Sequence, residues 1–404
     1  MSDFKSSPES RVAKHIAVLP KSGIRDFFDI VANMKEVISL GIGEPDFETP
    51  WRIREAAIHA LDRGFTSYTS NLGDPRLRKC ISLYVEDKFQ ACYAPERQIL
   101  VTVGVSEALD LALRALLNPG DEVLYHEPCY VSYAPSVRMC HAVPVPVHTL
   151  EEHDFVLQVE DLERAVTPRT KILLLNYPNN PTGAGLTLAD KQKLADFAIR
   201  HDLLVISDEI YEELSYIPRC QTIASLPGMA ERTILLNGLS KAHAMTGFRL
   251  GYACGPAPII DAMMKIHQYC MLCASSLAQA AALEALQSAD REKEMMRVEY
   301  EQRRNVIVKG LNEMGLHTFM PRGAFYVFPN ITSSGLDSMT FAKSLLASKH
   351  VAVVPGTAFG DCGEGFVRCS YATSMADIEE ALRRIRAFLA ELKAGGNCPA
   401  PHKP

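Results

Sequence analysis

Between residues 98 and 254, short apolar runs alternate with segments of helical pattern, and this alternation restricts the fold more than any other feature. The runs are rich in Val, Ile and Leu, as expected of strands buried on both faces of a mostly parallel sheet. Such alternation indicates a three-layer α/β/α domain, with right-handed crossovers between its parallel strands. The predicted strands are Ile99–Val103, Glu122–Tyr125, Lys171–Leu175, Leu203–Ser207, Thr233–Leu236 and Arg249–Cys254.

Helices are predicted between these strands, for example over Ala108–Leu117 and Thr187–His201. The second begins with Thr187 and Asp190, a variant of the capping box that marks helix starts.

The pattern changes after about residue 285. A long charged helix is predicted over 290–314, followed by GAFYVFP, a helix over 340–350, the short strand VAVVP and a last helix over 375–393. We therefore expect a large α/β domain over 49–289 and a smaller α+β domain that combines 1–48 with 290–404. The closing GGNCPAPHKP predicts a disordered tail.

Composition excludes several classes of protein. The net charge of −6 argues against nucleic-acid binding, which usually needs a basic face, and against attraction to anionic membranes. No apolar run reaches the roughly 18–20 residues of a membrane span. The first residues, MSDFKSSPESRVAKH, lack the apolar centre of a signal peptide. We expect a cytoplasmic protein.

The 11 cysteines are expected to be reduced thiols. Cys270 and Cys273 form a CxxC, a spacing found in zinc and redox sites. There is no second CxxC in the sequence, so we interpret these as free thiols and expect no metal site.

Polar and aromatic residues follow five of the predicted strands, where ligands of open α/β sheets bind. The segments are GVSEA, HEPCYVSY, NYPNNPTG, DEIY and NGLSK. The helix that begins after Gly104 offers free N–H groups to a phosphate. Ser240 and Arg249 add a hydroxyl and a cation, and Lys241 is the only amine among these groups.

The other groups suit an aromatic ring. Asp208 can keep a ring nitrogen protonated, Asn180 and Tyr211 can bond a phenolic oxygen, and Tyr130 offers a flat face. A phosphate, a pyridine nitrogen, a phenol and an aldehyde that needs a lysine together describe pyridoxal 5'-phosphate (PLP).

The chain resembles the class I/II (fold type I) PLP-dependent aminotransferases, in the aspartate and aromatic aminotransferase branch. The motifs NNPTG, SDEIY and SKAHAMTGFRLGY carry the resemblance, which covers roughly residues 20 to 393. It implies that Lys241 forms a Schiff base with PLP and that Asp208 holds the pyridine nitrogen. It also implies that Asn180 and Tyr211 bind the phenolic oxygen, and that Tyr130 stacks on the ring.

The resemblance further implies a phosphate site, a substrate site and a homodimer. Its phosphate residues are Arg249 and the loop Gly104, Val105 and Ser106, with Ser240 beside them. Tyr68 matches a tyrosine that reaches the phosphate of the neighbouring subunit. Arg368 matches the arginine that binds the substrate α-carboxylate, and Gly43 a backbone contact near it. One departure is Gly238, where many relatives carry a serine that can bond the phosphate.

The implied reaction moves the amino group of an L-amino acid to a 2-oxo acid, which we expect to be 2-oxoglutarate. Some bacterial aspartate enzymes carry lysine at the position of Ser106, so we favour an aromatic or broad-range donor. Aspartate, alanine, kynurenine and acylated diaminopimelate remain alternatives, as does a PLP-dependent carbon–sulfur β-lyase.

Non-enzymatic roles are less consistent with the sequence. The same fold serves some transcription regulators, but the region before about residue 20 is too short for their winged helix. A purely structural or binding protein would have no use for Lys241.

Overall fold

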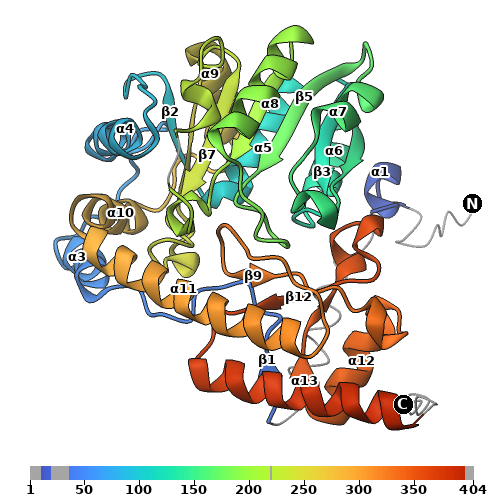
Figure 1. Cartoon of the computed structure of the whole chain (residues 1–404). Helices are drawn as coiled ribbons and strands as arrows, with labels where there is room; N and C mark the ends of the chain where they lie inside the picture. Colours follow the sequence, from blue (N-terminus) through green and yellow to red (C-terminus); the bar gives the residue numbers. More distant parts are fainter. Residues whose placement is uncertain (1–10, 20–35, 219–220, 396–404) are drawn as a thin grey trace, which may run out of the picture.

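The computed structural model describes residues 11–19, 36–218 and 221–395, and shows two bodies (Figure 1). The upper body is built around a large sheet, and the lower body combines helices with short strands. Residues 396–404 of the predicted tail lie outside the described residues, as do 1–10 and 20–35 of the N-terminal segment.

The large sheet has the strand order β2-β8-β7-β6-β5-β3-β4. β8 runs antiparallel to both of its neighbours, and the other adjacent pairs are parallel. A mostly parallel sheet is therefore confirmed. The strands are β2 (Ile99–Thr102), β3 (Glu122–Glu127), β4 (Val143–His148), β5 (Thr170–Asn176), β6 (Leu204–Asp208), β7 (Thr233–Gly238) and β8 (Gly251–Cys254).

Two details differ from the prediction. β8 begins at Gly251 because Arg249 has a left-handed backbone, with φ 51°, at the end of the 3₁₀ turn Thr246–Phe248. β4 was not predicted, because its sequence VPVPVH contains two prolines. It is an edge strand, where the missing N–H groups of proline are tolerated.

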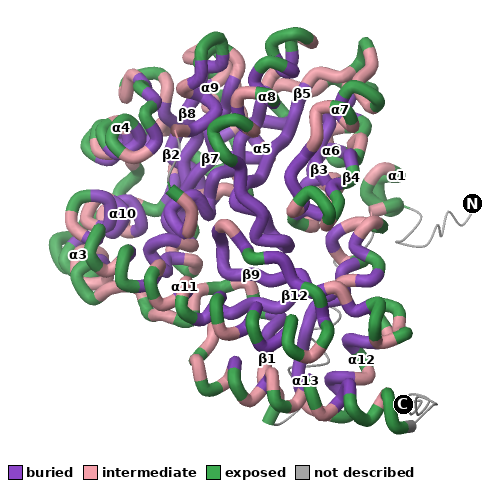
Figure 2. Tube along the Cα trace, in the orientation of Figure 1, coloured by how far each residue is buried: buried purple, intermediate pink, exposed green. Residues whose placement is uncertain are grey.

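Neighbouring residues of each strand pack into cores on opposite faces of the sheet. Ile172 and Leu174 belong to the core beneath α5 (Gly104–Leu116), α6 (Tyr133–Met139) and α9 (Ala257–Cys270). Leu173 and Leu175 pack on the other face, with α7 (Val159–Ala165) and α8 (Leu188–Arg200). The helices α4 (Pro75–Phe89) and α10 (Ser276–Ser288) cover the β2 end of this second face. The strands are buried between these layers (Figure 2), which confirms the three-layer fold.

The lower body has its own core, in which Tyr300, Phe325, Phe341 and Phe388 are buried. It contains an antiparallel sheet of order β11-β12-β9 and a parallel pair of β1 with β10. Its elements are β1 (Ile38–Ser39), α11 (Asp290–Glu313), β9 (Tyr326–Val327), α12 (Ser338–Lys349), β10 (Val351–Ala352), β11 (Val354–Pro355), β12 (Val367–Ser370) and α13 (Met375–Gly395).

The N-terminal segment contacts both bodies. β1 pairs with β10 of the lower body. The short helix α1 (Lys14–Ala17) instead lies beside α6, where the rings of His15 and His141 are 4.3 Å apart. Next in sequence, α3 (Trp51–Asp62) packs on α10. We propose that the two bodies correspond to the predicted domains, 49–289 and 1–48 with 290–404.

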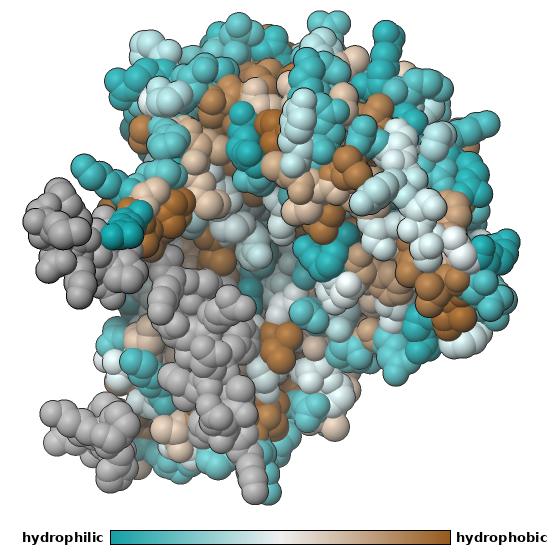
Figure 3. Space-filling model, turned by 180° about the vertical axis from the view of Figure 1, so that it is seen from behind, coloured by the Kyte–Doolittle hydropathy of each residue, from teal (hydrophilic) through white to brown (hydrophobic). Residues whose placement is uncertain are grey.

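The surface seen from behind is hydrophilic over much of the upper body, with apolar patches among the polar side chains (Figure 3). Within the described ranges, no helix combines the length and the apolar character that crossing a membrane requires.

Candidate active site

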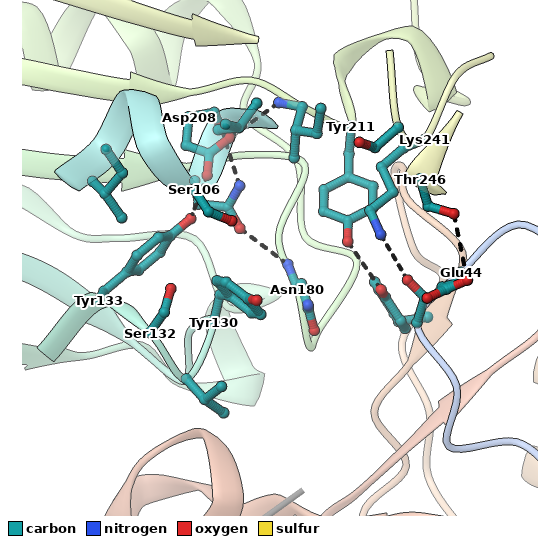
Figure 4. Close-up of a pocket in the computed structure, with 18 of the residues that line it drawn as sticks. Glu44, Ser106, Tyr130, Ser132, Tyr133, Asn180, Asp208, Tyr211, Lys241 and Thr246 are labelled. Carbon is teal, nitrogen blue, oxygen red and sulfur yellow. Dashed lines mark hydrogen bonds between the residues drawn. The ribbon is translucent and has the colours of Figure 1, made fainter. Parts of the chain in front are cut away.

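A cavity of about 840 Å³ lies where the carboxyl ends of β5, β6 and β7 and the start of α5 face the lower body. Figure 4 shows Lys241 and Asp208 on different elements around this cavity. Most of the predicted site residues line it: Gly43, Val105, Ser106, Tyr130, Asn180, Asp208, Tyr211, Ser240, Lys241, Arg249 and Arg368.

Asp208 is the last residue of β6, and its carboxyl group is buried. Burial raises its pKa to about 6, and the hydroxyl of Tyr133, which donates to Oδ2 at 2.8 Å, opposes this rise. Asn176, the partner of Asp208 in β5, donates its amide to the Asp208 backbone oxygen at 3.0 Å. The side chain is thus fixed in a medium that disfavours its charge unless a cation is near.

Lys241 lies in the turn that follows β7, and its Nζ donates to the carbonyl oxygen of Gly43 at 2.7 Å. Burial lowers the pKa of this amine to about 8, and the nearby carboxylate of Glu44 opposes the shift. A lysine with this pKa exchanges protons readily near neutral pH, unlike a surface lysine.

The start of α5 forms an anion-binding corner with Arg249. Gly104, the first residue of the helix, has φ 76°, and a Cβ there would lie 2.5 Å from Nη2 of Arg249. Only glycine allows the guanidinium group to come so close. Arg249 donates to the carbonyl oxygen of Thr246 at 3.1 Å. The N–H groups of a first helical turn have no intrahelical acceptor, so an anion bound here would be stabilised.

Packing explains the glycine at position 238. A Cβ on Gly238 would lie 3.0 Å from both the Cα of Gly251 and the carbonyl oxygen of Leu250. A serine at position 238, whose hydroxyl could bond a phosphate in relatives, would therefore not fit between β7 and β8 without a shift of the backbone. Ser106 and Ser240 still line the cavity.

Arg368, on β12, is a buried and nearly immobilised cation. Its Nη1 donates to Oδ1 of Asn180 at 2.9 Å, and its Nη2 donates to the carbonyl oxygen of Gly41 at 2.6 Å. The rings of Tyr326 and Phe359 lie 4.6 and 4.8 Å from the guanidinium carbon. Nε is buried and has no hydrogen-bond partner. The planar guanidinium group presents N–H donors in a fixed arrangement that matches the two oxygens of a carboxylate.

Two site tyrosines were missed by the sequence reasoning. Tyr133 bonds Asp208, and the hydroxyl of Tyr326 lies 2.9 Å from that of Tyr211. Both stand in segments that the sequence singles out, HEPCYVSY and GAFYVFP. Nothing in those segments showed which of their aromatic residues would turn inward.

Two predicted residues do not line the cavity. Gly104 borders it through its contact with Arg249. Tyr68 is 81 % exposed. Its predicted role depends on a second subunit.

The sequence matches the family model for class I and II aminotransferases over residues 35–385. Since this match spans most of the chain, the protein belongs to that family and is an aminotransferase. Enzymes of this family generally depend on PLP.

Individual relatives agree with this assignment. The chain is 49 % identical to putative aminotransferase YugH of Bacillus subtilis, over 94 % of this chain and 98 % of that protein. It is 48 % identical to an aspartate aminotransferase of Pyrococcus abyssi, over 92 % and 96 %. The solved aromatic aminotransferase of Pyrococcus horikoshii is 47 % identical, with a TM-score of 0.88, over 92 % and 99 %.

Proposed function

We propose that this aminotransferase binds PLP in the cavity and holds it through the amine of Lys241. The observation that carries the proposal is that Lys241 and the buried Asp208 lie around one cavity beside an anion-binding helix start. The residues fit the cofactor. The α5 corner with Arg249 offers donors to a phosphate, and Asp208 offers a buried carboxylate to a protonated pyridine.

PLP, when bound, supplies an aldehyde that reacts with amines and a protonated ring that accepts the electron pair left by loss of the Cα proton. Lys241 Nζ takes that proton from the substrate Cα and later returns it, as its lowered pKa allows. Asp208 Oδ atoms hold the ring proton in place. Tyr211 and Asn180 orient the phenolic oxygen, and Tyr130 covers one face.

We propose that Arg368 binds the substrate α-carboxylate, with Gly43 beside it. Among the described residues that line the cavity, the basic side chains are Lys241, Arg249 and Arg368, and each already has a proposed role. Because Ser106 adds no fourth cation, an aromatic or broad-range donor is favoured over aspartate, with 2-oxoglutarate as the acceptor. Apolar lining residues, such as Ile42, Leu109 and Val131, support this preference.

The test is the visible spectrum of the full chain with added PLP. Wild-type protein is expected to show the band of PLP joined to an amine, and Lys241→Ala to lack it. Lys265→Ala, which removes an exposed lysine 64 % accessible at its side chain, is the matched control and should keep the band. A wild-type protein that gives no band with excess PLP would contradict the proposal.

The same spectrum identifies the donor class. Single amino acids added without an acceptor should bleach the band, and aromatic ones should do so at lower concentration than aspartate. Pyruvate and ammonia released from cysteine conjugates, without bleaching by any amino donor, would instead favour the β-lyase alternative.

We also propose a homodimer, in which Tyr68 reaches the phosphate of the partner subunit. Its high exposure in the single chain supports this role. The cytoplasm is the proposed location, since the described cysteines are free thiols, as a reducing compartment allows.

A further inference from the structure

Three side chains capable of binding a metal meet at the ends of β3 and β4, outside the cavity described above. They are Glu127, His148 and Cys362, and their ligand atoms all lie within 4.8 Å of one another. Glu127 and His148 are direct partners in the parallel pair β3–β4, with His148 Nε2 3.7 Å from Glu127 Oε2. Cys362 comes from the turn Asp361–Gly363, far away in the sequence.

We propose that Glu127, His148 and Cys362 bind one Zn²⁺ ion. A carboxylate oxygen, an imidazole nitrogen and a thiolate sulfur are the three ligand types that zinc takes in proteins. The 3.7 Å between His148 Nε2 and Glu127 Oε2 is close to the ligand–ligand distance of a tetrahedral zinc site, whose ligands lie roughly 2.0–2.3 Å from the metal. The distances from these atoms to Cys362 Sγ are at most 4.8 Å, so a small side-chain adjustment brings the thiolate to the metal. Three protein ligands leave the fourth position to water. On binding, the Cys362 S–H bond breaks, the proton goes to solvent and a metal–sulfur bond forms.

The surroundings of Glu127 already hold its carboxylate in a ligating position. Tyr125 donates its hydroxyl to Oε1 at 2.9 Å, which leaves Oε2 facing His148. Such outer partners orient the ligands of metal sites. Gly360, with φ 125°, brings its turn so close that a Cβ would collide with the Glu127 carboxyl group. The His148 side chain is 55 % exposed, which gives an ion access from solvent.

The site joins the two bodies close to the active site. Glu127 precedes the segment that carries Tyr130, and the backbone N–H of Cys129 in that segment donates to the carbonyl oxygen of Phe359 at 3.1 Å. Phe359 in turn lies over Arg368. The turns between β11 and β12 thus contact the sheet body. An ion bound here would tie the Tyr130 segment to the turn that supports Arg368.

Cobalt titration of the full chain tests the proposal, because Co²⁺ replaces Zn²⁺ and absorbs strongly in the near ultraviolet when it binds a thiolate. Wild-type protein should bind one Co²⁺ per chain with this band, and Zn²⁺ should remove it. Cys362→Ser should lose the band. The double variant Cys270→Ser, Cys273→Ser, which removes the CxxC, is the control and should keep it.

A variant of Tyr125, which donates to the Glu127 carboxylate, tests whether this hydrogen bond orients the ligand. Tyr125→Phe should weaken the metal affinity by about 10- to 100-fold while the band keeps its shape. The thermal midpoint of each variant without metal confirms that it is folded. No band in the wild type, a band that survives Cys362→Ser, or one lost only in the CxxC variant would each overturn the proposal.

Discussion

At the scale of single residues, burial of the charged Asp208 carboxylate lowers the stability of the folded protein. Its folded-state pKa of about 6 lies above the ordinary 3.8, so folding takes up a proton between these values. The destabilisation is therefore complete above pH 6 and is relieved as the pH falls from 6 towards 3.8. A shift of this size corresponds to about 3 kcal/mol at most.

We predict that Asp208→Asn stabilises the PLP-free protein, because the amide removes the buried charge and can still accept from Tyr133. At pH 7.5 the thermal midpoint should rise, by an amount that reflects about 1–3 kcal/mol, and the difference should vanish near pH 4. The same variant should lose transaminase activity, because stability gained by removing an active-site charge commonly comes at the cost of function. A lower midpoint at pH 7.5 would show that the Asp208 carboxylate supports the fold.

Residue types and strand ends were enough to predict that Lys241, Asp208 and Arg249 share one site, and all three line the cavity. Gly43 and Arg368 were predicted only through the family resemblance. Tyr133 was not predictable in the same way. It begins α6, a helix of 7 residues with no side-chain cap, and Tyr130 three positions earlier was an equally good aromatic. Glu44 and Tyr326 also line the cavity, and they could not be predicted because they reach it only where the two bodies pack together.

At the scale of elements, the cavity depends on a close approach of β7, β8 and the start of α5. Gly251 stands at the centre of this contact. A Cβ there would lie 2.6 Å from the backbone nitrogen of Val105 and 2.7 Å from the carbonyl carbon of Gly104. Backbone atoms cannot move aside as a flexible side chain can, so added volume would displace the first turn of α5.

We predict that Gly251→Ala lowers stability by about 1–3 kcal/mol and weakens PLP binding, because it moves the N–H groups of α5 that we propose bind the phosphate. Thermal unfolding and a PLP titration measure the two effects. In Gly247→Ala the added carbon would have nothing within 4 Å, so its thermal midpoint should stay near that of the wild type. Equal midpoints for the two variants would mean that α5 adapts without cost.

The elements themselves followed from the sequence wherever strands are buried on both faces. β5 and β6 contain the apolar runs ILLL and LVI, and the capping box of Thr187 and Asp190 is present at the start of α8. β4 was not predicted because Pro144 and Pro146 reduce the strand propensity of its sequence. These prolines are tolerated because β4 lies at the edge of the sheet. Edge position is a property of the whole sheet and is not visible in a local pattern.

At the scale of the whole molecule, the site needs both bodies. Gly43, Tyr326 and Arg368 come from the N-terminal segment and the lower body, whereas Lys241 and Asp208 come from the sheet body. A hydrogen bond between the hydroxyls of Tyr211 and Tyr326 joins the two bodies at the cavity. Relative movement of the bodies would therefore change the substrate site directly.

The proposed dimer predicts that the exposed apolar surface around Tyr68 is the interface between the subunits. Phe65, Tyr269 and Leu272 are exposed on neighbouring segments, which are joined by a hydrogen bond from Asn71 Nδ2 to the carbonyl oxygen of Leu272 at 2.8 Å. Tyr269 is 86 % exposed, and exposed apolar side chains that gather on neighbouring segments are typical of protein–protein contact surfaces.

We predict that Tyr269→Asp shifts the protein from dimer to monomer in size-exclusion chromatography with light scattering, because it places a charge inside the interface. PLP affinity should fall with it, since Tyr68 then lacks a partner phosphate. Met320→Asp alters an apolar side chain that is 49 % exposed elsewhere, and it should leave both the mass and the affinity unchanged. A Tyr269→Asp protein that stays dimeric would move the interface to another face, and a monomeric wild type would leave Tyr68 without its proposed role.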